Sequence, residues 1–168
     1  MPAPATDGLK VKGLLAVPKK EGRYPCLIFN RGGNREFGAL DDIAMVRLLG
    51  GPASWGYITA ASQYRGNAGG EGQEEFGGKD VDDVLNLIPS FDNIAGADTT
   101  RIGVFGWSRG GMETYLALAK TCRFKAGVIA SGMADAFSTI RKRPKRPVPN
   151  VTCLWPSRMT LARKISPA

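Results

Sequence analysis

Short, largely apolar runs recur along the first 130 residues and are separated by segments of mixed polarity. Runs of this kind are typical of strands that are buried on both faces of a parallel sheet. A more mixed segment, Leu9–Val17, predicts an additional strand ahead of them. The runs that we interpret as buried strands are Cys26–Phe29, Tyr57–Ala61, Ile102–Phe105 and Phe124–Ala130.

The segments between these strands carry apolar residues at the spacing of one helix face. Positions i, i+3, i+4 and i+7 are apolar within Asp80–Ile88, and Asp83 lies on the opposite, polar face. The same spacing recurs after Gly111, and Ile43–Leu49 predicts a helix that ends near Gly50. Strands that alternate with helices in this way predict an α/β fold, with three α/β/α layers around a mostly parallel sheet.

This pattern ends near residue 140, and the charge distribution changes at the same place. Residues 1–140 carry 15 basic and 15 acidic residues, so the net charge of +8 comes from the rest of the chain. Residues 141–168 hold eight Lys and Arg residues, no acidic residue, and five of the 11 prolines. We therefore predict an ordered domain over 1–140 and a basic, proline-rich tail over 141–168 that is disordered or out of frame.

Composition excludes several classes of protein. No apolar run is long enough to span a membrane, and the opening residues lack the apolar region of a signal peptide. The three cysteines are scattered, which supports neither a disulfide framework nor a metal site, and we expect Cys26 and Cys122 to be small buried hydrophobes. We expect a cytoplasmic protein without cofactor, metal, membrane or nucleic-acid partner, because residues 1–140 lack a basic excess.

The segment Gly106-Trp107-Ser108-Arg109-Gly110 has the pattern G-x-S-x-G. A predicted strand leads into it and a predicted helix follows it, which is the context of a nucleophile elbow. We predict that Ser108 is the nucleophile and that the backbone N–H of Arg109, at the helix N-terminus, binds the oxyanion. Glycine is needed two residues before and after the serine, because side chains there would collide with neighbouring backbone.

A second glycine-rich loop, Asn30–Asn34, follows the predicted strand Cys26–Phe29. Parallel strands end at the same edge of a sheet, so this loop is expected near Ser108. Gly32 and Gly33 allow its backbone to approach a substrate closely. We therefore predict that Gly32 and Gly33 form the second part of the oxyanion site.

Together these segments resemble the catalytic α/β-hydrolase domain of the prolyl oligopeptidase family of serine peptidases. The resemblance covers roughly residues 7–137. Arg31 stands where that family usually has histidine, whereas the two glycines after it match the family. The matching segments, in order, are Arg31-Gly32-Gly33, Gln63-Tyr64-Arg65-Gly66, Gly77–Val84 and Arg101–Met112.

The resemblance implies an incomplete α/β-hydrolase fold and a serine-type hydrolase that acts on a peptide or an ester through an acyl-enzyme. In this family an acid and then a histidine follow the nucleophile along the chain. The chain contains no histidine, so Asp135, after the last predicted strand, has no imidazole to orient. We expect residues 1–140 to be the N-terminal part of such a domain, truncated or frameshifted before the acid and histidine, and almost inactive alone.

Two other functions compete with this interpretation. One is a catalytically dead binding module that uses its basic tail on acidic partners, and the other is a nucleotide-binding α/β protein. The second ranks last because neither G-x-x-x-x-G-K-[ST] nor G-x-G-x-x-G follows any predicted strand.

Four side chains have structural alternatives to a functional role. The guanidinium groups of Arg65 and Arg109 suit a substrate carboxylate or carbonyl. Alternatively, Arg65 anchors its own loop through backbone carbonyls. We expect Glu113 at the surface, or as a cap, and Trp107 in a packing role.

Overall fold

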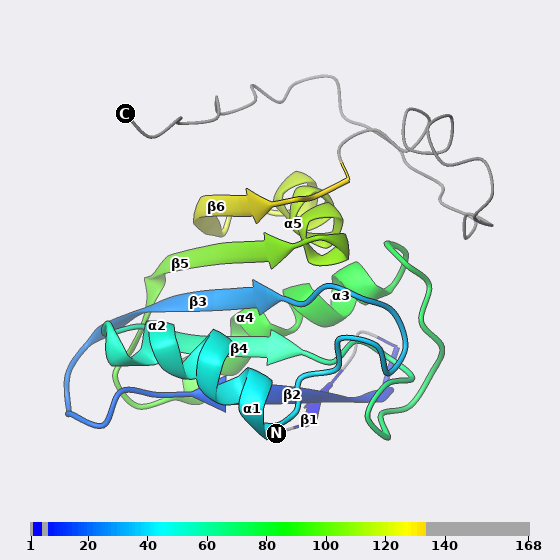
Figure 1. Cartoon of the computed structure of the whole chain (residues 1–168). Coiled ribbons are helices and arrows are strands. Elements are labelled where there is room, and N and C mark those ends of the chain that lie inside the picture. The colour runs from blue at the N-terminus through cyan, green and yellow to red at the C-terminus, as the bar shows by residue number, and fades with distance from the viewer. Residues whose placement is uncertain (1, 5–6, 134–168) are drawn as a thin grey trace, which may run out of the picture.

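The central element of the structure is a six-stranded sheet with the strand order β1-β2-β4-β3-β5-β6 (Figure 1). The computed structural model describes the backbone of residues 2–4 and 7–133 and the side chains of residues 7–133, so Asp135 and the predicted tail lie outside it. β3, β4, β5 and β6 are parallel, whereas β1 and β2 pair antiparallel with their neighbours. The strands are β1 (Pro2–Pro4), β2 (Lys10–Ala16), β3 (Tyr24–Asn30), β4 (Ile58–Ser62), β5 (Ala97–Trp107) and β6 (Phe124–Ala130).

Helices cover both faces of this sheet (Figure 1). In β3, Ile28 packs into one core with residues of α3, and the next residue, Phe29, packs into a second core with Leu49 of η1. In β4, Ala60 packs into the first core and the next residue, Ala61, packs into the second. The three-layer α/β/α architecture is therefore confirmed. The helical elements are α1 (Asp42–Ala44), the π-helix η1 (Met45–Gly50), α2 (Gly51–Ser54), α3 (Asp80–Leu85), α4 (Leu87–Ser90), the 3-10 helix η2 (Phe91–Asn93) and α5 (Arg109–Lys120).

The first helical run differs from its prediction. It continues through Gly50 and ends only at Ser54, because Pro52 lies in the first turn of α2, where its missing N–H removes no helix hydrogen bond. Gly56, with φ +91°, then turns the chain toward β4. Ile43 and Val46, whose spacing predicted a buried face, are 64% and 66% exposed.

The predicted helix Asp80–Ile88 is divided into α3 and α4 at Asn86. Pro89 explains the division, because proline donates no hydrogen bond to the carbonyl four residues earlier, that of Leu85. The longest helix in the described part of the chain is α5, with 12 residues. Among the described residues, no helix is long and apolar enough to cross a membrane.

The four parallel strands end at one edge of the sheet, and three loops meet there. They are residues 31–41 after β3, residues 63–79 after β4, and the short turn between β5 and α5. Open α/β sheets bind ligands at this edge. The fold therefore places both glycine-rich loops and the G-x-S-x-G segment where a site is expected.

At one end of the sheet, β6 pairs with β5 and with no other described strand. Val128 in its centre is 59% exposed. An apolar edge strand is a template for pairing with another chain. We therefore expect the 168-residue chain to self-associate, and we expect Val128→Lys to shift it toward monomer.

Light scattering after size exclusion measures this shift. Val17→Lys is the matched control, because Val17 is 50% exposed and lies outside the strands. Equal effects of the two substitutions, or a parent chain that is already monomeric, would contradict an associating β6 edge.

Candidate active site

Ser108 lies on the turn that joins β5 to α5. Its backbone has φ 56° and ψ −118°, a conformation that is costly for a residue with a side chain. The turn is held by the Ser108 N–H, which donates to the Ala130 carbonyl at 2.8 Å. Ser108 is exposed at the edge where the parallel strands end. The strand–turn–helix setting predicted for this serine is therefore present.

The two glycines of the motif allow this turn to pack closely. A Cβ at Gly106 would overlap the Gly110 carbonyl and the Thr114 hydroxyl. A Cβ at Gly110 would overlap the Asn30 carbonyl and would lie 2.7 Å from the Arg31 carbonyl oxygen. The start of α5 is thus pressed against the end of β3.

The predicted oxyanion loop lies directly beside the serine. A Cβ at Gly32 would be 3.2 Å from the Ser108 Cβ and 3.1 Å from the Trp107 carbonyl oxygen. The next residue, Gly33, has φ +77°. The backbone N–H of Arg109 belongs to the first turn of α5, where N–H groups have no acceptor within the helix. The structure therefore brings the four predicted residues together, and their catalytic roles stay predictions.

The side chain of Arg109 is buried beneath the turn rather than presented to a substrate. Its guanidinium contacts the carboxyl groups of Asp80 at 2.6 Å, of Glu113 at 3.3 Å, and of Glu74. It also lies between the rings of Tyr64 and Phe76, 4.6 and 4.5 Å from their centroids. Burial disfavours the cation, but these carboxylates raise the pKa of Arg109 overall.

Arg65 is also buried, and it anchors its loop differently from the prediction. Its Nη2 is 2.7 Å from Asp83 Oδ1, and its Nη1 is 2.8 Å from Asp7 Oδ2. The partners are carboxylates rather than backbone carbonyls. Asp83 is thus a buried ion-pair partner and not part of an exposed polar helix face. Burial raises the pKa of Asp83, although Arg65 acts in the opposite direction.

Arg31, which stands where the resemblance implied a histidine, binds backbone carbonyls. Its side chain donates to the Gln63 carbonyl at 2.9 and 3.2 Å, to the Arg35 carbonyl at 3.0 Å and to the Gly32 carbonyl at 3.2 Å. The residue is 1% exposed. Burial lowers the pKa of this guanidinium. Arg31 therefore fastens the loop after β3 to the end of β4.

Glu113 is fully buried, so its predicted surface position is wrong. Its Oε1 accepts from Arg109 Nε at 3.3 Å, and its Oε2 has no hydrogen-bond partner among the described residues. Burial raises the pKa of Glu113 to about 8, although Arg109 acts in the opposite direction. The folded chain therefore keeps this carboxyl protonated at pH values where an exposed glutamate is ionised.

We expect Glu113→Gln to reduce the pH dependence of stability between about pH 5 and about pH 8. The folded chain retains a proton that the unfolded chain releases above the ordinary pKa of 4.5. The free energy of unfolding therefore falls as pH rises through this range, by up to about 1.4 kcal/mol per pH unit. Glutamine is neutral throughout and removes this contribution.

Urea denaturation of both proteins at the two ends of the range measures the change. Glu21→Gln is the control, because Glu21 is exposed. An unchanged pH slope in Glu113→Gln would show that Glu113 does not hold the proton.

The buried charged cluster consists of Arg109 and the side chains that contact its guanidinium. Most of its members were not predicted from the sequence, and two other residues lie where they were not expected. Trp107 is 54% exposed rather than packed, and Cys122 is exposed, whereas Cys26 is buried as predicted. The i, i+4 spacing of Arg109 and Glu113 was the local signal that could have revealed their contact. The cluster members that were not predicted are Tyr64, Glu74, Phe76 and Asp80.

Within the described residues, the Ser108 side chain forms no hydrogen bond that could activate it. The whole chain contains no histidine. In the part of the chain that the structure describes, no group of three His, Cys, Asp or Glu residues could hold a metal ion. A serine without a neighbouring base is a weak nucleophile. The arrangement leaves room for an acyl carbonyl beside Ser108, but among the described residues it supplies no proton acceptor for the serine.

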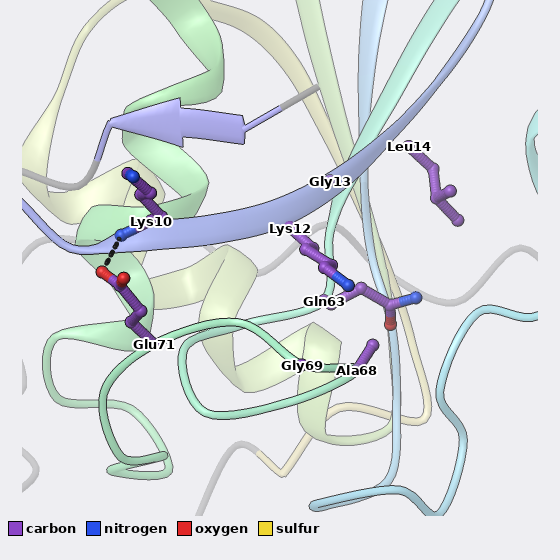
Figure 2. A pocket seen from close by; sticks show the side chains of 8 residues that line it. All are labelled: Lys10, Lys12, Gly13, Leu14, Gln63, Ala68, Gly69 and Glu71. Atoms are coloured by element: carbon purple, nitrogen blue, oxygen red, sulfur yellow. Dashed lines mark hydrogen bonds between the residues drawn. The ribbon is translucent and has the colours of Figure 1, made fainter.

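A separate pocket of about 450 Å³ lies beside β2 and the loop after β4. Figure 2 shows the Glu71 carboxylate at its rim, accepting from the backbone N–H of Lys10 at 2.8 Å. β4 and β3 separate β2 from β5 in the sheet, so this pocket is not at Ser108. Its lining residues are Lys10, Lys12, Gly13, Leu14, Gln63, Ala68, Gly69 and Glu71.

Comparisons with known proteins show similarity in sequence and in fold. The family model described as "Prolyl oligopeptidase family" matches residues 45–148. The uncharacterized peptidase YtmA of Bacillus subtilis is 33% identical over 139 residues, which are 82% of this chain and 52% of YtmA. The chain thus spans about half the length of YtmA.

Solved structures are also similar to this chain. An acylaminoacyl peptidase of Pyrococcus horikoshii is 30% identical, with a TM-score of 0.63 over 79% of this chain and 22% of that one. The α/β hydrolase GrgF of Penicillium sp. sh18 is 20% identical, with a TM-score of 0.70 over 86% of this chain and 49% of that one. The latter likeness shows the α/β-hydrolase fold. Fold and family match together establish that the chain belongs to the prolyl oligopeptidase family.

Proposed function

We propose that this chain supplies the nucleophile and the oxyanion site of a serine-type hydrolase that acts on peptides or esters. The observation that carries the proposal is the position of Ser108. It is exposed on a strained turn, with Gly32 beside it and the first N–H of α5 following it. Family membership, which the matched residues 45–148 establish, supports hydrolysis as the chemistry.

In the proposed reaction, Ser108 Oγ attacks the acyl carbonyl carbon while its proton passes to a histidine from outside these 168 residues. The carbonyl oxygen becomes an oxyanion that accepts from the N–H groups of Arg109 and of the Gly32–Gly33 loop. The tetrahedral intermediate collapses, and the leaving group takes the proton and departs. Water then attacks the acyl-serine, which releases the acid and restores the hydroxyl.

The proposed substrate is a small molecule or peptide that carries an acyl carbonyl. YtmA and the Pyrococcus protein are named as peptidases, which favours an amide, and GrgF is named only as a hydrolase. The same acyl-serine forms from an ester with a good leaving group. An activated ester can therefore report on Ser108 without knowledge of the natural substrate.

Trapping the acyl-serine tests the proposal. Because Ser108 is exposed, a base in solution can reach its hydroxyl. The full chain is treated with p-nitrophenyl acetate in the presence of 2-methylimidazole, a base too hindered to carry the acetyl group efficiently itself. Peptide mapping then locates the acetyl group. We expect it on Ser108, where it persists because acetyl-serine is an unactivated alkyl ester, which water attacks far more slowly than the serine attacks the p-nitrophenyl ester.

Ser131 is the matched internal control. It is exposed, has φ 54°, and lies one residue beyond β6 at the same sheet edge. We expect Ser108 to be acetylated about 100-fold faster than Ser131, because oxyanion donors contribute on that scale. Equal acetylation of the two serines, or total labelling unchanged by Ser108→Ala, would contradict the proposal.

A further inference from the structure

Two buried arginines bind consecutive carbonyls of the loop beside Ser108. Arg31 Nη1 donates to the Gly32 carbonyl at 3.2 Å, and Arg109 Nη1 donates to the Gly33 carbonyl at 3.2 Å. The exposed fractions are 1% for Arg31 and 4% for Arg109. Both carbonyls are therefore drawn toward the interior of the protein.

The geometry of the peptide bond gives these contacts a consequence for the loop. In a planar trans peptide, the C=O and the N–H point in opposite directions. When the carbonyls of Gly32 and Gly33 turn inward, the N–H groups of Gly33 and Asn34 turn outward. The Gly33 N–H has no hydrogen-bond acceptor among the described residues, whereas Asn34 pairs with Phe37 in an isolated antiparallel bridge. The Gly33 N–H is therefore the group that an oxyanion can use while the loop is held in this orientation.

The arginines are themselves held rigidly. The ring of Tyr64 contacts both guanidinium groups, at 5.1 Å from Arg31 and 4.6 Å from Arg109. The Tyr64 hydroxyl donates to the Arg31 carbonyl at 3.0 Å. Arg31 is fixed further by the Gln63 carbonyl, and Arg109 by Asp80 at 2.6 Å. Side chains locked in this way can fix the orientation of a neighbouring peptide.

We propose that Arg31 and Arg109 are positioning residues, whose side chains hold the Gly32 and Gly33 carbonyls so that the Gly33 N–H faces the oxyanion. This inference rests on the proposed function and extends it, because it gives Arg109 two roles in the oxyanion site. The backbone N–H of Arg109 is one hydrogen-bond donor, and its side chain helps to hold the loop that carries the other donor. Arg31 has the second of these roles only.

A lysine scan of three buried arginines tests this proposal. Lysine keeps the charge but lacks the fork of donors that reaches several acceptors at once. Arg65→Lys is the matched control, because Arg65 is equally buried and its recorded partners among the described residues are Asp7 and Asp83, not the loop. The three substitutions are made in the full chain, and circular dichroism confirms that each variant is folded.

Two measurements distinguish positioning from a merely structural role. One is the amide NMR signal of Gly33, and the other is the rate of Ser108 acetylation with 2-methylimidazole. We expect Arg31→Lys and Arg109→Lys to shift or split the Gly33 signal and to slow acetylation about 10- to 100-fold. We expect Arg65→Lys to leave this signal in place and the rate within about twofold.

Each outcome decides a separate claim. If Arg65→Lys slows acetylation as much as the other two, or if none of the three changes the Gly33 amide signal, the arginines are structural and the inference is wrong. If Ser108 of the parent chain is not acetylated, the proposed function fails, and the Gly33 amide signal alone judges the inference. If a lysine variant does not fold, hydrogen exchange in the parent decides, because a protected Gly33 amide would contradict an outward-facing N–H group.

Discussion

The 168-residue chain alone should hydrolyse p-nitrophenyl acetate no faster than its Ser108→Ala variant. Ser108 has no activating partner among the described residues, and the chain has no histidine. Removal of the base from a serine triad lowers kcat by roughly 10⁴- to 10⁶-fold. The oxyanion donors that remain stabilise charge but cannot remove the serine proton.

Steady-state release of p-nitrophenolate without added base measures this turnover. Ser131→Ala is the control, because it removes an exposed serine from the same edge without touching the G-x-S-x-G turn. Turnover that disappears only in Ser108→Ala would contradict the expectation. It would mean that a group within these 168 residues serves as the base.

The second large effect is expected at the glycines of the turn. We expect Gly106→Ala and Gly110→Ala each to lower the free energy of unfolding by about 3 kcal/mol or more. The added methyl would overlap backbone in both cases, at the Gly110 carbonyl or at the Asn30 carbonyl. Backbone at the junction of β3, β5 and α5 cannot move aside as a flexible side chain can. Urea denaturation measures the loss.

Gly103→Ala is the matched control in the same strand. A Cβ at Gly103 would lie 3.5 Å from Leu27 Cδ1, an ordinary van der Waals contact. We expect its effect to stay within about 1 kcal/mol. If Gly106→Ala and Gly110→Ala are no worse than Gly103→Ala, the turn is not packed as tightly as the structure indicates.

Much of the fold follows from the sequence because burial on two faces leaves a simple pattern. Cys26–Phe29 and Ile102–Phe105 are largely apolar, and both lie in parallel strands between two helical layers. The helical run at residues 42–54 was harder to delimit. Gly50 and Pro52 favour a helix end, but in this run they lie in a π-helix and in the first turn of α2.

Most of the buried charged pairs could not be predicted from local patterns, the exception being Arg109 and Glu113 at i, i+4. Asp80 and Asp83 occupy the first turn of α3, where acidic residues are normally exposed and interact with the helix dipole. Their partners, Arg109 and Arg65, lie 29 and 18 residues away in the sequence. A charged residue is buried only when such a partner is available, and that depends on the tertiary structure.

The positions of the predicted site residues depend less on contacts between distant parts of the sequence than the buried charged pairs do. Ser108 and Arg109 are set by one strand–turn–helix unit, and Gly32 by the end of the neighbouring strand. The side-chain contacts of Arg31 and Arg109 with the loop carbonyls needed the structure, because they depend on how three loops meet at the sheet edge.

Fluorophosphonate labelling with and without added base shows whether Ser108 is positioned as a nucleophile but lacks a base. The probe is applied to the full chain, and the modified serine is located by peptide mapping. We expect a label on Ser108 that appears with 2-methylimidazole and is almost absent without it. Base-independent labelling of Ser108, or labelling spread equally over exposed serines such as Ser131, would contradict it.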